Sequence, residues 1–182
     1  NMTEFGLLQK KGIIAFTDGL KTIQNTRLMS RIMKSAHDLN SLILQHAEDL
    51  ELSKNGMIND GIISTKLGLQ GIPDLAELII IERDLTLLES IKCRYHISQI
   101  SSKKSVEIVN ERKQKVKFTC GVSINNLSLN ENDIGDFRTF LKLSPPLRTE
   151  EDRMSLVDGL NNKTIDVIVS DHKPEDEEQK RL

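Results

Sequence analysis

Six segments rich in β-forming residues end in a polar side chain that could bind a metal ion, hold a substrate or move a proton. The six side chains are those of Asp18, His46, Gln99, Asn125, Ser144 and Asp171. Asp171 is the clearest case, because it follows the apolar run "IDVIV" and precedes an acidic, proline-containing loop. A carboxylate at the end of a buried strand is well placed to meet a divalent metal or a proton in transit.

These residues lie on a chain in which predicted strands and helices alternate. The predicted strands are Gly12–Asp18, Ser41–Asp49, Cys93–Ser101, Val116–Ile124, Phe140–Arg148 and Thr164–Asp171. Helices are expected at about residues 26–39, 73–90 and 103–113. A further helix is expected after Thr149, which forms a capping box with Asp152. Apolar strands that alternate with helices are typical of a parallel sheet covered by helices.

The polar strand ends favour one architecture over another. In a β/α barrel the carboxyl ends of all strands form a single active-site face, whereas a doubly wound sheet confines its site to one switch point. We therefore predict an α/β protein with a TIM-like (β/α) barrel. Six strands are too few to close such a barrel, so we expect an incomplete barrel of about six strands. Residues 1–182 would form the central and C-terminal part of a single barrel domain, with its first strands absent from this chain.

Composition excludes several classes of protein. Lys+Arg 25 nearly balances Asp+Glu 27, and five Phe, one Tyr and no Trp leave few rings for stacking on bases, so we expect no nucleic-acid partner. The longest apolar run, "LAELIII", is short for a membrane span, and no signal peptide opens the sequence. Cys93 and Cys120 show no metal or redox spacing and are expected to be buried free thiols. We expect a cytoplasmic protein without membrane contact.

Several motifs occur in a fixed order along nearly the whole chain: "AFTDG", "QHAED", "GIPDLAE", "RYHISQIS", "LKLSPPLRTEEDR" and "IDVIVSDHKPEDEEQKRL". In this order they resemble dihydroorotase, a member of the amidohydrolase superfamily. The resemblance implies a zinc-dependent cyclic amide hydrolase of de novo pyrimidine biosynthesis, which interconverts N-carbamoyl-aspartate and dihydroorotate. It also implies an earlier strand with a His-x-His metal pair, which nothing in this chain matches.

Carried over position by position, the resemblance implies three metal ligands, Asp18, His46 and Asp171. Asp171 would also be the catalytic residue that carries the proton. Taken from the residues alone, Asp18 is more typical of a turn cap before Gly19 than of a ligand, while the alternation of its strand points His46 toward the barrel interior. His96 is expected to face the helices as a structural histidine.

The chain departs from the family pattern at several of the implied positions. Gln99 stands where the family has a ligand histidine, which makes it a degenerate ligand position. Asn125 and Asn126 stand where the family usually has two histidines, Ser144 replaces an asparagine that contacts substrate, and Glu175 replaces a histidine. A neutral amide is a weak zinc ligand beside an imidazole, so we expect a depleted metal site.

The resemblance places the substrate-binding positions at Arg148, Ser144 and Asn126. Two functional classes then remain open. In the first, the protein is a working zinc hydrolase that acts on a small-molecule substrate. In the second, it is a non-catalytic homologue that keeps the barrel as an assembly partner of aspartate carbamoyltransferase. The substitutions favour the second class, with zinc lost or weakly bound. Unpaired strand edges also favour association, so we expect a homo-oligomer.

Overall fold

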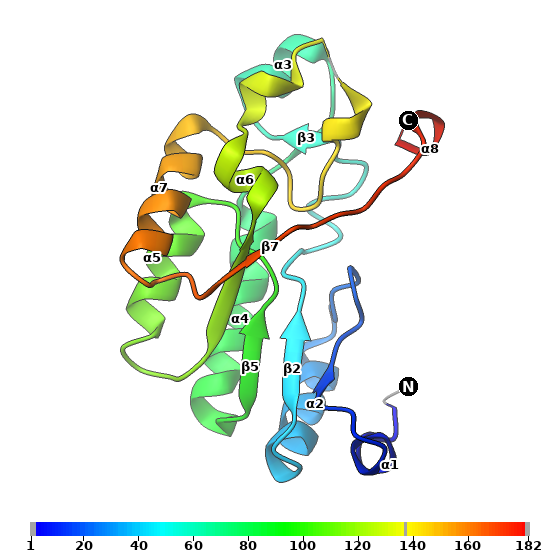
Figure 1. Cartoon of the computed structure of the whole chain (residues 1–182), viewed down its shortest axis with the longest axis vertical. Coiled ribbons are helices and arrows are strands. Elements are labelled where there is room, and N and C mark those ends of the chain that lie inside the picture. The colour runs from blue at the N-terminus through cyan, green and yellow to red at the C-terminus, as the bar shows by residue number, and fades with distance from the viewer. Residues whose placement is uncertain (1–2, 137, 181–182) are drawn as a thin grey trace.

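The computed structural model describes residues 3–136 and 138–180, and its centre is an all-parallel sheet. The sheet has five strands in the order β1-β2-β5-β6-β7 (Figure 1). Their bounds are β1 Ala15–Phe16, β2 Leu42–Gln45, β5 Arg94–Ile97, β6 Thr119–Ser123 and β7 Val167–Val169. The predicted α/β class with a parallel sheet is confirmed.

Four helices that connect these strands pack against one face of the sheet (Figure 1). They are α2 Thr26–Asp38, α4 Leu75–Ile91, α5 Lys103–Arg112 and α7 Glu150–Asn161. Each contacts the next in this order, so they form one continuous layer. None of the helices in the described residues is both long and apolar enough to cross a membrane.

Local sequence signals set the starts of these helices. Asn25 accepts a hydrogen bond from the backbone N–H of Leu28, which is one of the donors that the first turn leaves without a partner. Thr149 and Asp152 form the predicted capping box at α7, with each side chain bonded to the backbone N–H of the other. These bonds join residues three positions apart, so they are readable from sequence alone.

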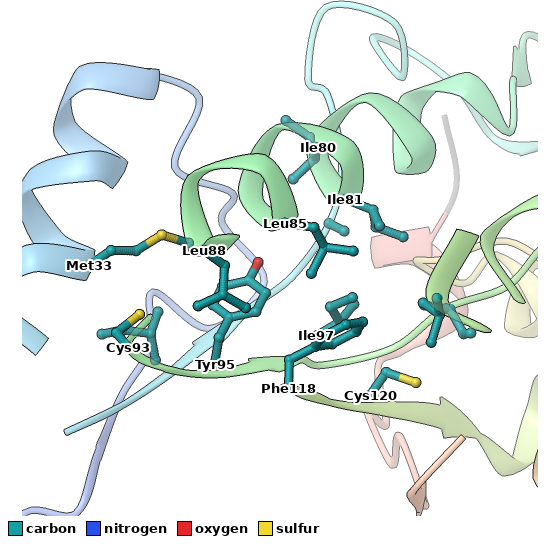
Figure 2. Close-up of a cluster of buried hydrophobic side chains, with 14 of the residues drawn as sticks. Met33, Ile80, Ile81, Leu85, Leu88, Cys93, Tyr95, Ile97, Phe118 and Cys120 are labelled. Atoms are coloured by element: carbon teal, nitrogen blue, oxygen red, sulfur yellow. The ribbon is translucent and has the colours of Figure 1, made fainter. Parts of the chain in front are cut away.

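The hydrophobic core lies between the helix layer and the sheet. Figure 2 shows Ile81, Leu85 and Leu88 of α4 lying over Tyr95 and Ile97 of β5, and all five are at most 2% exposed. Full burial of one such side chain contributes about 1.5–3 kcal/mol. This layer therefore holds the carboxyl ends of β2, β5 and β6 in fixed positions.

Both cysteines belong to this core. Cys93 and Cys120 are buried free thiols, as predicted. Burial raises the pKa of Cys93 to about 11 and that of Cys120 to about 12. Neither thiol is therefore a reactive thiolate at neutral pH.

The opposite face of the sheet is lined by residues that are in register with one another. Leu44 pairs with His96 and His96 pairs with Thr119, so the three side chains share one face. Tyr95 and Ile97 occupy the helix side, which leaves His96 on the open side, bonded to Thr119. The prediction that His96 faces the helices is wrong. It assumed strand alternation as far as Gln99, but β5 ends at Ile97.

A smaller unit lies beyond the carboxyl ends of the sheet (Figure 1). It pairs β3 (Ile58–Asn59) with β4 (Gly71–Ile72) and has its own core of Met57, Ile58, Ile134 and Leu147. The remaining elements are α1 Phe5–Lys10, α3 Ile62–Leu67, α6 Ile124–Ser128, α8 Glu177–Lys180 and the 3₁₀ helices η1 Glu131–Ile134 and η2 Thr139–Leu141.

The segment Phe140–Arg148 is not a strand, contrary to the prediction. It begins within η2 and continues as a loop through Pro145 and Pro146. Both prolines lack the N–H that a strand donates to its neighbour. The apolar pattern of the segment instead serves the smaller unit, where Leu147 is fully buried.

Candidate functional site

Three polar residues follow three strands of the sheet at its carboxyl edge. His46 directly follows β2, Gln99 lies two residues beyond β5, and Asp171 lies two residues beyond β7. The segment after β7 runs past the ends of β5 and β2 toward α8 (Figure 1). Asp171 has a φ of 48°, in the left-handed region that Asp tolerates better than most residues. The chain therefore turns at Asp171 as it leaves the strand.

His46 is buried and bonded to two side chains. Its Nε2 atom lies 3.0 Å from Glu48 Oε2 and 3.0 Å from Ser144 Oγ, and Ser144 also donates to Glu48. Burial alone would raise the pKa of Glu48, but hydrogen bonds from His46, Ser53 and Ser144 lower it below its ordinary value of 4.5. Glu48 is therefore an ionised acceptor, and the contact is satisfied by the tautomer of His46 that carries its proton on Nε2. In that tautomer the lone pair of the imidazole lies on Nδ1.

Asp171 is already paired with groups of the chain itself. Its Oδ1 atom accepts a hydrogen bond from Gln99 Nε2 at 3.1 Å and forms an ion pair with Lys173 Nζ at 2.5 Å. Lys173 also reaches the backbone oxygen of Ser144, at 3.5 Å. The Asp171 side chain is only 3% exposed. The Oε1 atom of Gln99 is buried and lacks a partner within the described part of the chain.

A cavity of about 260 Å³ lies against some of these groups. Its lining includes the carboxylates Glu48, Asp171 and Glu175, the lysines Lys142, Lys173 and Lys180, and the double-proline loop at Ser144. An adjoining cavity is lined by Asn125 together with Asp171 and Glu175. The structure thus brings together most of the predicted strand-end residues.

Asp18 is not among them. Its side chain is exposed and lines a separate cavity with Phe5, Phe16 and Ile23. Asp18 precedes Gly19, whose φ of 67° marks a turn, and Gly19 N bonds to the hydroxyl of Thr17. The ligand role for Asp18 stays a prediction that this arrangement does not support.

Asn126 and Arg148 are buried beneath the site. Asn126 is 3% exposed, and its Nδ2 atom donates to the backbone oxygen of Pro146. Arg148 is 4% exposed and donates to Ser101 Oγ, Asn59 Oδ1 and the backbone of Ile72. Burial lowers the pKa of Arg148 from its ordinary value, which is high enough for the guanidinium to remain charged. Both side chains hold loops in place, and their substrate roles stay predictions.

Sequence reasoning missed Lys173 and Glu48 as members of the site. Glu48 follows His46 by two residues within "QHAED", and Lys173 follows Asp171 by two residues. The sequence did contain a clue to Lys173, because the family that the chain resembles has an alanine at this position. What the sequence could not show is that both side chains fold back onto the residue two positions earlier.

The described residues do not by themselves supply the ligands of a catalytic metal ion. A catalytic zinc ion takes three protein ligands from imidazole, carboxylate or thiolate groups. Within residues 3–136 and 138–180, no group of three or more His, Cys, Asp or Glu side chains is placed to hold a metal. His46 directs a proton at Glu48, and Gln99 and Lys173 direct N–H groups at Asp171.

Known proteins resemble this chain in sequence. Residues 1–105 match the family model described as Dihydro-orotase-like. Proteins named dihydroorotase from Ehrlichia canis and Thermoanaerobacter sp. are 42% and 41% identical to the chain over its whole length. The matches cover 41% and 42% of those proteins, so the chain spans about two fifths of the length of these curated relatives.

Solved structures share the fold. D-hydantoinase (dihydropyrimidinase) from Thermus sp. superposes with a TM-score of 0.76 at 20% identity, covering 98% of this chain and 42% of that one. Dihydroorotase from Saccharomyces cerevisiae, in complex with 5-fluoroorotic acid, gives a TM-score of 0.72 at 15% identity, covering 98% of this chain and 50% of that one. At these identities the likeness shows the fold alone.

The parallel sheet, its helix layer and the likeness to these structures define a TIM-like (β/α) barrel, present here as an incomplete barrel. Within that class, the chain belongs to the dihydroorotase-like family. The predicted fold class and the predicted family are both confirmed.

Proposed function

We propose that this chain is part of a dihydroorotase-family protein of de novo pyrimidine biosynthesis, with N-carbamoyl-aspartate and dihydroorotate as its ligand class. Family membership supports the pathway. The cavity at the carboxyl edge supports the ligand class, because Lys142, Lys173 and Lys180 line it and both molecules carry carboxylates. Residues 1–182 would belong to a single barrel domain, and a cytoplasmic location fits this pathway.

We further propose that the site does not act as a zinc hydrolase. Zinc would supply an activated water and a polarised carbonyl. In this chain, His46 and Asp171 are the residues that would hold the zinc ion. The single observation that carries the proposal is that both groups are bonded within the chain: Gln99 and Lys173 donate to Asp171, and Nε2 of His46 contacts Glu48. The retained role is that of a barrel used for assembly.

The test is a turnover assay with metal analysis on the full-length protein. We expect sub-stoichiometric zinc and no conversion between N-carbamoyl-aspartate and dihydroorotate above the uncatalysed rate. Stoichiometric zinc with turnover that Asp171→Asn abolishes would contradict the proposal and establish the alternative, a working hydrolase. One observation favours that alternative: His46 and Asp171 lie at the same edge, linked through Ser144 and Lys173.

The proposed assembly role involves two partners, aspartate carbamoyltransferase and a second copy of the protein. Exposed apolar side chains near both edge strands support it, since Ile14 before β1 is 81% exposed and Ile168 in β7 is 48% exposed. Light scattering on the full-length protein, alone and mixed with the carbamoyltransferase of the same organism, measures both partners. We expect a homo-oligomer alone and a larger complex in the mixture. A monomer that does not change mass on mixing would contradict the assembly role.

A further inference from the structure

Among the described residues, the Lys173 ammonium is the only full positive charge paired with Asp171. Lys173 Nζ is 2.5 Å from Asp171 Oδ1, and Gln99 Nε2 donates to the same oxygen from 3.1 Å. The Asp171 side chain is 3% exposed, whereas that of Lys173 is 34% exposed. A carboxylate with so little contact with water needs a cation or several hydrogen-bond donors to remain ionised at modest cost.

The ammonium also joins the two halves of the site. From Asp171 it reaches the backbone oxygen of Ser144 at 3.5 Å, and the Ser144 hydroxyl contacts His46 Nε2 and Glu48 Oε2, both at 3.0 Å. The end of β7 is thus connected through one lysine to the end of β2. A bridging cation between two strand ends is the structural role that a metal ion would fill.

Chemically, the two cations differ. A divalent metal attracts a carboxylate and also polarises water or a carbonyl. An ammonium attracts the carboxylate through three donors but offers no empty coordination position. Gln99 also differs from a metal ligand. It presents an N–H group to Asp171, whereas a metal ligand would present a lone pair to the ion.

We infer that the Lys173 ammonium is the resident cation of this site: it replaces a metal as the charge partner of Asp171 and excludes divalent ions from the carboxyl edge. The inference deepens the proposed non-catalytic function and rests on it for the location of the site.

The test is a Zn²⁺ titration of the purified full-length protein by calorimetry, with wild type compared with Lys173→Met. The matched control is Lys142→Met, which removes a lysine from the same cavity without touching the Asp171 pair. We expect Lys173→Met to bind Zn²⁺ at least roughly tenfold more tightly than wild type, because Asp171 then lacks its charge partner. Lys142→Met should match wild type.

Thermal unfolding gives a second, independent readout. Lys173→Met should unfold at a lower temperature than wild type and regain stability with added Zn²⁺, whereas wild type and Lys142→Met should show no zinc-dependent shift. Lys173→Arg keeps the charge and should behave as wild type. If the methionine variant does not fold, Lys173→Gln replaces it, since a side chain that is 34% exposed accommodates an amide.

Two results would overturn the inference. One is stoichiometric Zn²⁺ binding by wild type, and the other is a zinc affinity that Lys173→Met leaves unchanged. These results are distinct from failure of the proposed function. Bound zinc without turnover removes the inference and leaves a non-catalytic protein, while turnover by wild type that holds no metal removes the proposed function and leaves the inference.

Discussion

Two clusters of polar residues lie close together in this molecule and behave differently. The rim cluster lies at the carboxyl edge of the sheet and consists of His46, Glu48, Gln99, Ser144, Asp171 and Lys173. The inner cluster lies beneath it and consists of Asn59, Glu77, Ser101, Ser105 and Arg148. Both contain charged groups from distant segments, so residue type does not distinguish them.

The inner cluster is nearly closed to solvent and its charged groups are fully bonded. Glu77 is 3% exposed and accepts hydrogen bonds from Ser101 N, Ser101 Oγ and Ser105 Oγ. Arg148 donates to that same Ser101 hydroxyl, and also to Asn59 and the backbone of Ile72. These bonds tie the start of α4 and the loop before α5 to the smaller unit.

The rim cluster, by contrast, lines a larger cavity, of about 260 Å³, through Glu48, Ser144, Asp171 and Lys173, and the buried Oε1 atom of its Gln99 has no partner among the described residues. Complete bonding fixes a structure, whereas a larger cavity and an unpartnered polar atom leave room for a ligand. The comparison indicates that the inner cluster positions the rim, where we propose that ligands bind. Three measurements test this division, and a fourth concerns the open face of the sheet.

The largest expected effect is that of Arg148→Met. The change leaves Asn59 Oδ1 buried without the Arg148 donor, removes one of two donors from the carbonyl of Ile72 and removes the positive charge beside Glu77, so we expect a loss of about 3–5 kcal/mol in the free energy of unfolding. Denaturant unfolding measures it. The control is Lys115→Met, which breaks an exposed pair with Glu111 and should leave stability nearly unchanged. Equal losses in the two variants would contradict the structural role of the inner cluster.

Glu77→Gln comes next. The carboxylate accepts from three donors, and an amide at the same place turns an N–H group toward one of them. We expect a loss of about 2 kcal/mol. Equilibrium unfolding in urea, compared with Glu51→Gln at an exposed position, measures the difference. A free energy of unfolding equal to that of wild type would show that the hydrogen bonds from Ser101 and Ser105 do not depend on the negative charge of Glu77.

Ser144→Ala tests the rim directly and should have a smaller effect. The hydroxyl bonds to His46 and Glu48, but the residue is only half-buried and water can replace it. We expect a loss of about 1 kcal/mol. Exposed Ser128→Ala is the matched control and should not change the unfolding midpoint. A loss as large as that of Arg148→Met would make the rim part of the structural core.

The smallest effect concerns His96 on the open face. Burial lowers its pKa below the ordinary value of 6.5, nearby Lys113 lowers it further, and Asp166 opposes the shift. The unfolded chain then takes up the proton more readily than the folded chain, so stability is complete above pH 6.5 and falls as the pH drops through that value. The free energy of unfolding of the wild type, measured above and below pH 6.5, should show this dependence on pH. His96→Asn should reduce it, and an unchanged slope would contradict the assignment.

The sequence predicted the local features well. The start of α2, the capping box at α7 and the burial of both cysteines depend on residues close in sequence or on apolar character. It also placed His46, Gln99 and Asp171 at strand ends that meet at one edge. The prediction failed for Phe140–Arg148 and for the direction of His96, since each depended on where a strand ends.

Spacing along the chain thus determined which residues form helices and strands, because capping and side-chain periodicity act over a few positions. Only the tertiary structure decided which partner each polar group received. Lys173 pairs with Asp171 because the backbone turns there, and Arg148 is buried because three distant segments close around it. Electrostatic pairing depends on distances in space and on exclusion of water, and neither is fixed until the segments pack together.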